Sequence, residues 1–150
     1  MTKILVTAAL GQIGTELVLA LRQTYGAENV IASDLRDVSK VDKDFLPYEK
    51  LDVLDRVSFA AVIKKHDVKV IHHLAAILSA AGEKNPQLCF DVNITGLYNV
   101  LEVARELVLS KLSAQAQLQF LAPKHRVTTL RSKLSFCQKQ CMACLKPQES

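Results

Sequence analysis

Short apolar runs of the kind that form buried strands recur four times in the first 106 residues. Each is rich in apolar or β-branched residues and ends at a polar or glycine-bearing turn. The pattern predicts strands at Lys3–Thr7, Asn29–Ser33, Tyr48–Leu51 and Val68–His72. A polar, charged loop is expected at residues 35–47, and another polar loop after the fourth strand.

The segments between these strands carry apolar residues at helical spacing. The spacing predicts a helix from Gln12 to about Tyr25, ended by Gly26, and a second that starts at Asp55 and runs to about His66. Asn85-Pro86 opens a third, because Asn caps free amides and Pro tolerates the first helical position. Strands that alternate with helices pair in parallel, so the fold class is α/β, a doubly wound parallel sheet of about four strands.

The pattern stops beyond about Glu106. Residues 107–150 hold 7 Lys/Arg against 1 Asp/Glu, whereas residues 1–106 hold 12 against 14. We therefore predict a half-domain at 1–106 and a basic, Cys-containing, poorly ordered tail at 107–150, irregular or partly helical near 107–121. No fifth strand is expected, which would leave an exposed sheet edge and favour aggregation.

Composition excludes several classes of protein. No apolar run approaches the length of a membrane span, and Met1 leads directly into a strand without a targeting pattern. The uneven charge does not suggest a specific nucleic-acid binder. We expect a soluble protein, most simply cytoplasmic, with mitochondria possible for a full-length eukaryotic parent.

A glycine-bearing turn, Thr7-Ala8-Ala9-Leu10-Gly11-Gln12-Ile13-Gly14, connects the first strand to the first helix. A pyrophosphate can bind free amides and the positive end of the helix dipole at such a turn. Gly11 would let the backbone approach phosphate, and Gly14 would let helix and strand pack closely. The alternative is that both glycines serve packing alone.

Asp34 ends the second strand about twenty residues after that turn. A carboxylate there accepts hydrogen bonds from ribose hydroxyls and repels a 2′-phosphate, which favours NAD over NADP. Arg36 weakens this preference without reversing it. The alternative is an ordinary strand-end aspartate.

Residues 1–106 resemble the extended short-chain dehydrogenases of the NAD-dependent epimerase/dehydratase family, specifically their L-threonine 3-dehydrogenase branch. The matching stretches are ILVTAALGQIGTEL, ENVIASD, YEKLDVLD, HLAAILSAAGEKNP and VNITGLYNVLEVAR. The resemblance implies a partial Rossmann fold, NAD as cofactor, threonine as the substrate of the full-length enzymes, and a possible homodimer in the family. The implied cofactor-binding residues are Thr7, Leu10, Gly11, Gln12, Ile13, Gly14, Asp34, Asp52, Val53, Leu74, Ala75, Ala76 and Asn93. Ser79 is implied to approach substrate, with a solvated loop serine as the alternative.

One position departs from the family pattern, which has glycine where this chain has Ala8. That glycine allows a tight turn out of the strand. We expect the methyl group to weaken NAD binding by roughly 1–3 kcal/mol if the position needs a positive φ.

The proton-transfer machinery of the family, a Tyr with a Lys four residues later, is missing. Neither Tyr25, Tyr48 nor Tyr98 has Lys at that spacing, so no catalytic residue is assigned. Codons exist for residues 138–146 (QKQCMACLK) that, read from the third base, encode Lys-Thr-Met-Tyr-Gly-Val-Ser-Lys, the family's catalytic segment. Residues 115–122 similarly yield Ser-Thr-Ile-Ala-Val-Phe-Gly. We hypothesise a frameshift between about Glu106 and Gln115.

Cys137, Cys141 and Cys144, with His125, invite a metal-site interpretation, but out-of-frame translation explains them without one, and no metal is assigned. His72 and His73 look like a strand end. The sequence thus predicts a truncated, inactive relative of L-threonine 3-dehydrogenase that binds NAD weakly. The alternatives are a non-catalytic NAD-binding or interaction module and a sugar-nucleotide epimerase-like protein.

Overall fold

A computed structural model describes residues 2–107, 109 and 111–114 of the chain. These residues belong to one compact unit, residues 1–117, and the second unit, residues 118–150, lies outside the described part. The tail hypotheses on His125, Cys137, Cys141 and Cys144 therefore concern residues outside the description. Among the residues described, no cluster of three metal-ligating side chains occurs. No helix in the same residues has the length and apolar character needed to cross a bilayer.

Five strands form one parallel sheet in the order β3-β2-β1-β4-β5. They are β1 (Lys3–Thr7), β2 (Val30–Asp34), β3 (Tyr48–Lys50), β4 (Val68–His73) and β5 (Lys111–Ala114). The order places β1 at the centre and lets the chain wind outward in both directions. The α/β fold class expected from the sequence is confirmed, and the first four strands begin and end within one residue of their predicted bounds.

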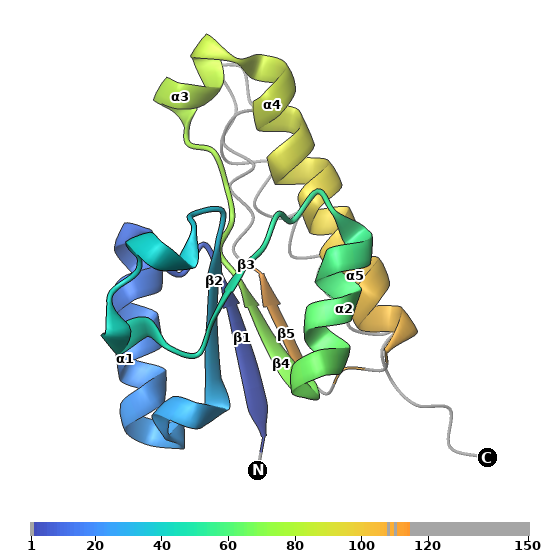
Figure 1. Ribbon diagram of the computed structural model, residues 1–150. Coiled ribbons are helices and arrows are strands. Elements are labelled where there is room, and N and C mark those ends of the chain that lie inside the picture. Colours follow the sequence, from blue (N-terminus) through green and yellow to red (C-terminus); the bar gives the residue numbers. More distant parts are fainter. Residues whose placement is uncertain (1, 108, 110, 115–150) are drawn as a thin grey trace, which may run out of the picture. The chain divides into compact units, whose positions relative to one another are not determined.

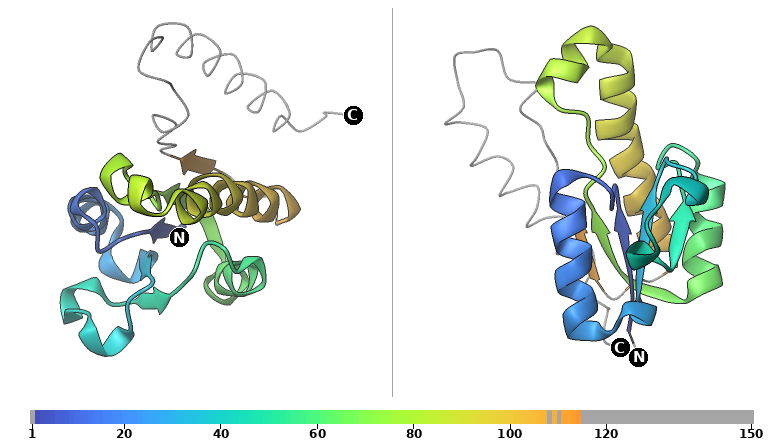
Figure 2. Two further views of the ribbon diagram at one scale, coloured as in Figure 1. Left: turned by 90° about the horizontal axis from the view of Figure 1, so that it is seen from above. Right: turned by 60° about the vertical axis from the view of Figure 1, so that its left-hand side comes forward.

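The helices cover the sheet on both faces (Figures 1 and 2). They are α1 (Gln12–Tyr25), α2 (Arg56–His66), α3 (Ser79–Lys84), α4 (Pro86–Phe90) and α5 (Leu97–Glu106). On one face of the sheet, Val18 of α1 packs against Ile4, Val6 and Val30. On the opposite face, Phe59 of α2 and Val100 of α5 belong to a second core cluster. Its strand residues include Leu5, Ile31 and Ile71. The two cores hold the central strand rigidly from both sides.

The helix boundaries follow from local capping. The carboxylate of Asp55 accepts the amides of Val57 and Ser58 at 3.1 and 3.0 Å, and Asn85 accepts the amide of Leu88 at 3.2 Å ahead of Pro86. These bonds satisfy amides that the first helical turn leaves without partners. Both predicted helix starts are confirmed.

The expectation that the chain supplies no fifth strand is wrong. Residues 111–114, for which helix was considered, form β5 and pair in parallel with Val70–His73 of β4. The open edge of β4 offers a row of unpaired backbone groups, and pairing with it outweighs the weak local preference of a Lys-Leu-Ser-Ala segment. The edge strand on this side of the sheet is therefore β5.

Other segments are more regular than the sequence suggested. The loop at 35–47 contains two short 3-10 turns, η2 (Val38–Lys40) and η3 (Lys43–Phe45). The segment before β2 contains one, η1 (Ala27–Asn29). The loop after β4 leads into α3. Helices α4 and α5 are joined by a π-helical turn, η4 (Asp91–Gly96), so the three form one continuous helical rod.

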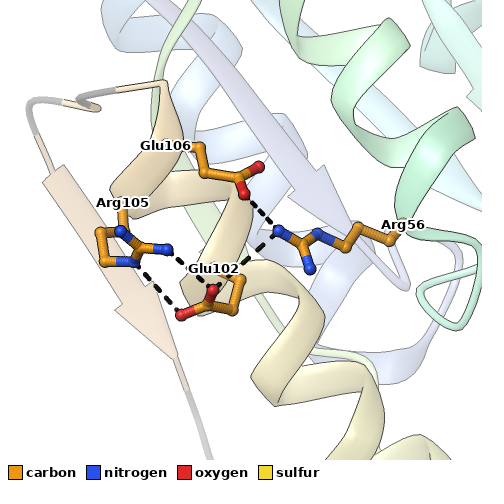
Figure 3. A network of polar contacts seen from close by, with 4 residues as sticks. All are labelled: Arg56, Glu102, Arg105 and Glu106. Atoms are coloured by element: carbon orange, nitrogen blue, oxygen red, sulfur yellow. Dashed lines mark hydrogen bonds and ion pairs between the residues drawn. The ribbon is translucent and has the colours of Figure 1, made fainter.

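Charged side chains join α2 to α5 on the surface. Arg56 of α2 pairs with Glu106 and lies 3.9 Å from Glu102, which in turn pairs with Arg105 at 2.9 Å (Figure 3). Because Arg105 and Glu106 are exposed and Arg56 and Glu102 are only partly buried, solvent screens the attraction and the network contributes little to stability.

Candidate functional site

Three neighbouring strands end side by side at the carboxyl edge of the sheet, the edge formed by the C-terminal ends of its strands. Because β1, β2 and β4 are parallel neighbours, their carboxyl ends at Thr7, Asp34 and His73 lie side by side. In open α/β sheets, ligands bind outside this edge, where the chain winds away from the central strand in both directions. Here the order reverses between β1 and β4, and the glycine turn lies directly above β1.

Backbone hydrogen bonds fix the glycine turn. The amide of Ala9 donates to the carbonyl of Ser33 at 2.9 Å, and the amide of Gly11 donates to the carbonyl of Ala8 at 3.1 Å. Ala8 has φ 51°, in the left-handed region that favours glycine. The expected weakening of NAD binding by Ala8 depends on a positive φ at this position, and the turn has one.

The two glycines differ in how strictly they are required. A Cβ atom on Gly14 would lie 2.2 Å from the carbonyl oxygen of Ala8 and 2.8 Å from the Cα of Ala9, so no other residue fits without moving backbone. A Cβ on Gly11 would lie 3.2 Å from the same oxygen, a tight but smaller conflict. Gly14 therefore sets the close packing of α1 on the turn after β1, as predicted.

The first turn of α1 is available to an anion. Gly11 is the N-cap residue, no side chain among the described residues caps the helix, and no acidic residue lies in its first turn. The leading amides of a helix have no intrahelical partners, and the helix dipole places partial positive charge there. Gln12 and Ile13 are exposed at this end, so an approaching phosphate would meet their backbone directly.

Asp34 lies against the same turn. One carboxylate oxygen, Oδ2, accepts the amide of Leu10 at 3.3 Å, and the other, Oδ1, accepts the amide of Leu35 at 2.8 Å. The side chain is half-buried. Its remaining lone pairs are available to hydroxyl donors beside the glycine turn, the position that the sequence predicted for a ribose-binding acid.

Thr7 connects the ends of β1 and β4. Its hydroxyl accepts the amide of Leu74 at 3.1 Å and lies 3.0 Å from Nδ1 of His73. Both side chains are buried, and burial lowers the pKa of His73 to about 4, so the imidazole is neutral at physiological pH. The role of His73 in fixing this edge was not anticipated. The sequence feature that could have indicated this contact is a polar residue at the end of each of two predicted strands, Thr7 and His73.

The segment after β4 is held by Asn93. The carboxamide of Asn93 accepts the amide of Ile77 at 2.7 Å and donates to the carbonyl of Ile77 at 3.0 Å. Asn93 lies in η4, a type of helical distortion that occurs frequently at functional sites. Leu74, Ala75 and Ala76 extend between the Thr7 contact and this one, half-buried along the edge of the sheet.

Asp52 and Val53 lie after β3, where α5 contacts them. Val53 is 7% exposed and belongs to the core beside Gly96, while Asp52 is exposed and accepts the amide of Leu54 at 2.9 Å. The carboxamide of Asn99 donates to the carbonyl of Val53 at 3.1 Å and so fixes this turn. Ser79 is the first residue of α3 rather than a loop residue, and the contacts of its side chain lie outside the described part of the structure.

The fold and the edge just described define a Rossmann-like α/β protein with a glycine-bearing turn between the carboxyl end of its central strand and its first helix. Residues 4–123 match the NAD dependent epimerase/dehydratase family, and the chain belongs to that family. The match continues past Glu106 and includes β5.

Known proteins of two kinds are similar to the chain. An uncharacterized epimerase/dehydratase of Staphylococcus haemolyticus (strain JCSC1435) is 47% identical over 108 residues, which cover 70% of this chain and 33% of the relative. An L-threonine dehydrogenase structure from Cupriavidus necator in its holo form has 44% identity and a TM-score of 0.69, covering 73% of this chain and 35% of that one.

A UDP-glucose 4-epimerase from Thermotoga maritima, solved with UDP-glucose, has 25% identity and a TM-score of 0.65, covering 75% of this chain and 37% of that one. The chain thus spans about a third of the length of the relatives it matches. It is a family member related both to threonine dehydrogenases and to UDP-glucose epimerases.

Proposed function

We propose that this chain is the NAD-binding part of a threonine dehydrogenase-like protein and that it binds NAD weakly without turning over threonine. The observation that supports this most is the uncapped amino end of α1 beside Asp34, at the point where the strand order reverses. The pyrophosphate would be held by the backbone of Leu10–Gly14, with Thr7 fixing the edge below it.

The residues present fit a dinucleotide, apart from Ala8. Gly14 leaves no room for a side chain, and Gly11 little, so backbone rather than side chains faces the space above β1. The adenosine ribose would bind Asp34, and the adenine would lie near Asp52 and Val53. Leu74, Ala75 and Ala76, held in place through Thr7 and Asn93, would line the rest of the cofactor. NAD would supply the hydride acceptor.

The coenzyme preference follows from the charge at the end of β2. A 2′-phosphate placed at the ribose site would face the carboxylate of Asp34, and the repulsion between the two negative charges opposes binding. Arg36, two residues later, offers partial compensation only. We therefore propose that the coenzyme is NAD rather than NADP. We also propose that Ser79 lies near the amino-acid substrate.

Turnover is not proposed for this chain. General acid–base transfer from a substrate hydroxyl needs a tyrosine whose pKa a nearby lysine lowers. The three tyrosines of this sequence lack that lysine. The family's reaction, oxidation of the threonine hydroxyl to a ketone, would thus require a chain that contains the Tyr-x-x-x-Lys segment.

We place the protein in the cytoplasm, like a soluble metabolic enzyme.

A sugar-nucleotide substrate is the second candidate, and the similarity to the Thermotoga maritima epimerase favours it. The higher identity to the threonine enzyme supports the amino-acid substrate over it. Both candidates share the NAD site and differ only in the substrate.

Coenzyme titration tests the proposal. NADH and NADPH are added to the purified protein, and binding is followed by the fluorescence of the reduced nicotinamide ring. We expect saturable NADH binding, weaker NADPH binding, and loss of the difference in Asp34→Asn. No NADH should form from NAD and threonine. Equal affinity for both coenzymes, or threonine-dependent NADH formation, would contradict the proposal.

A further inference from the structure

Strand β3 contacts the turn that follows β2 in three ways. The amide of Leu51, just after β3, donates to the carbonyl of Asp34 at 2.9 Å. The hydroxyl of Tyr48 lies 2.7 Å from the carbonyl oxygen of Arg36 and 3.2 Å from that of Asp34. The ammonium group of Lys50 pairs with Asp37 at 2.6 Å. All three contacts fall on the four residues 34–37.

Tyr48 is placed for this task by the pleat of the strand. Tyr48 and Lys50 are two residues apart and share a face of β3, whereas Glu49 points the other way and pairs with Lys65 and His66 of α2. The Tyr48 ring is buried, with 7% of the residue exposed, in the core beneath α1. A buried ring leaves its hydroxyl only a small range of positions.

A hydroxyl has one proton, so Tyr48 donates to one carbonyl at a time, and Arg36 is the nearer. Burial, and then the negative charge of Asp34, raises the pKa of Tyr48 to about 12, which keeps the proton available for donation. The turn carries Asp34 and Arg36, the acid and the base that would decide between a ribose 2′-hydroxyl and a 2′-phosphate, while its second acid, Asp37, is paired with Lys50. A contact that fixes the backbone at both residues controls which of the two side chains meets the ribose.

We propose that Tyr48 and Lys50 are positioning residues for coenzyme selectivity: from β3 they hold the 34–37 turn so that Asp34, and not Arg36, is presented beside the glycine turn. This inference rests on the proposed NAD site and adds a determinant that does not contact the coenzyme. Without the contacts of Tyr48 and Lys50, the 34–37 turn becomes mobile, Asp34 loses its fixed position, and Arg36 gains access to a 2′-phosphate.

The test compares the ratio of NADPH to NADH dissociation constants in three proteins. Tyr48→Phe removes the hydroxyl and keeps the ring in the core. Tyr25→Phe is the matched control, because Tyr25 lies on α1 and is half-exposed, away from the turn. Loss of one hydrogen bond predicts roughly a three- to ten-fold weakening of NADH binding in Tyr48→Phe. NADPH binding should change less than about two-fold, and Tyr25→Phe should keep the wild-type ratio.

A general loss of stability would weaken both coenzymes alike, so the ratio separates positioning from a structural role. If Tyr48→Phe has the same ratio of NADPH to NADH dissociation constants as the wild type, the inference is overturned. The proposed function still stands in that case, provided that the wild type binds NADH. If the wild type binds neither coenzyme, both fall. Should Tyr48→Phe fail to fold, Lys50→Met acts on the same turn from the surface, and an unchanged ratio there also overturns the inference.

Discussion

The hydroxyl of Thr7 lies 3.0 Å from Nδ1 of His73, and this buried pair joins the carboxyl ends of β1 and β4. The contact fixes the two strand ends between which the strand order reverses. It also makes the stability of the edge depend on pH, because an imidazole that is buried and neutral in the folded protein becomes charged in the unfolded chain.

The pH dependence has a definite sign. The pKa of His73 is about 4 when folded, below its ordinary value of 6.5, so the unfolded state takes up a proton first as the pH falls. The free energy of unfolding should decrease by up to about 3 kcal/mol between pH 6.5 and pH 4. Urea unfolding at several pH values measures it, and His73→Asn should show a flatter profile in that interval. A wild-type slope in the variant would show that His73 is not responsible.

Relief of strain at Ala8 should both stabilise the protein and strengthen coenzyme binding. Ala8→Gly removes a Cβ from a residue at φ 51°, which predicts a gain of about 1 kcal/mol in the free energy of unfolding. Removing the methyl group from the phosphate turn should also tighten NADH binding by roughly 1–3 kcal/mol. Thermal unfolding and NADH titration measure the two effects separately.

Asp67 provides a matched control for Ala8. It has φ 50° at the end of α2, remote from the glycine turn, so Asp67→Gly should stabilise the protein by a similar amount and leave NADH affinity unchanged. If Ala8→Gly also leaves the affinity unchanged, the methyl group does not obstruct the phosphate.

The two turn glycines should respond differently to substitution. Gly14→Ala places a Cβ 2.2 Å from a backbone oxygen that cannot rotate away, so we expect a loss of about 3 kcal/mol or more in unfolding free energy. Gly11→Ala meets the same oxygen at 3.2 Å and should cost about 1 kcal/mol or less. Chemical denaturation of both variants decides it, and equal losses would contradict the packing argument.

The coding DNA tests the frameshift hypothesis. Across the codons of residues 138–146, the frame read from the third base should encode a tyrosine followed four residues later by a lysine. A histidine codon in place of the tyrosine, or a stop codon in that frame, would end the hypothesis.

The parts of the fold with strong local signals were predictable. Lys3–Thr7 forms a strand as expected because a β-branched run is bounded by a glycine turn, and Asp55 and Asn85 cap helices because their short acceptors reach free amides. Strand β5 was missed because its four residues, Lys-Leu-Ser-Ala, include no β-branched or aromatic side chain. Its structure is set by the open edge of β4, which is a tertiary effect.

The candidate site was predictable where it depends on residue type and not where it depends on backbone partners. The packing role of Gly14 was predictable because only glycine allows so close an approach to Ala8. Asp34 ends β2 as expected, and its binding of a ribose stays a prediction. The contacts of Tyr48 and Arg22 could not be predicted, since both act on main-chain carbonyls that the sequence does not mark. Arg22 joins the start of β2 to the segment before β3, because its guanidinium donates to the carbonyls of Val30 and Phe45 at 3.0 and 2.8 Å.

The central claim is that a dinucleotide binds at the amino end of α1, and amide chemical-shift mapping tests it most directly. ¹⁵N-labelled protein is titrated with NAD while the backbone amide signals of residues 10–14 and 34–36 are followed. We predict that these signals shift together and saturate, with smaller changes at residues 74–76 and none on the surface where Arg56 pairs with Glu106. Shifts that saturate elsewhere, or a spectrum that NAD leaves unchanged, would contradict the account.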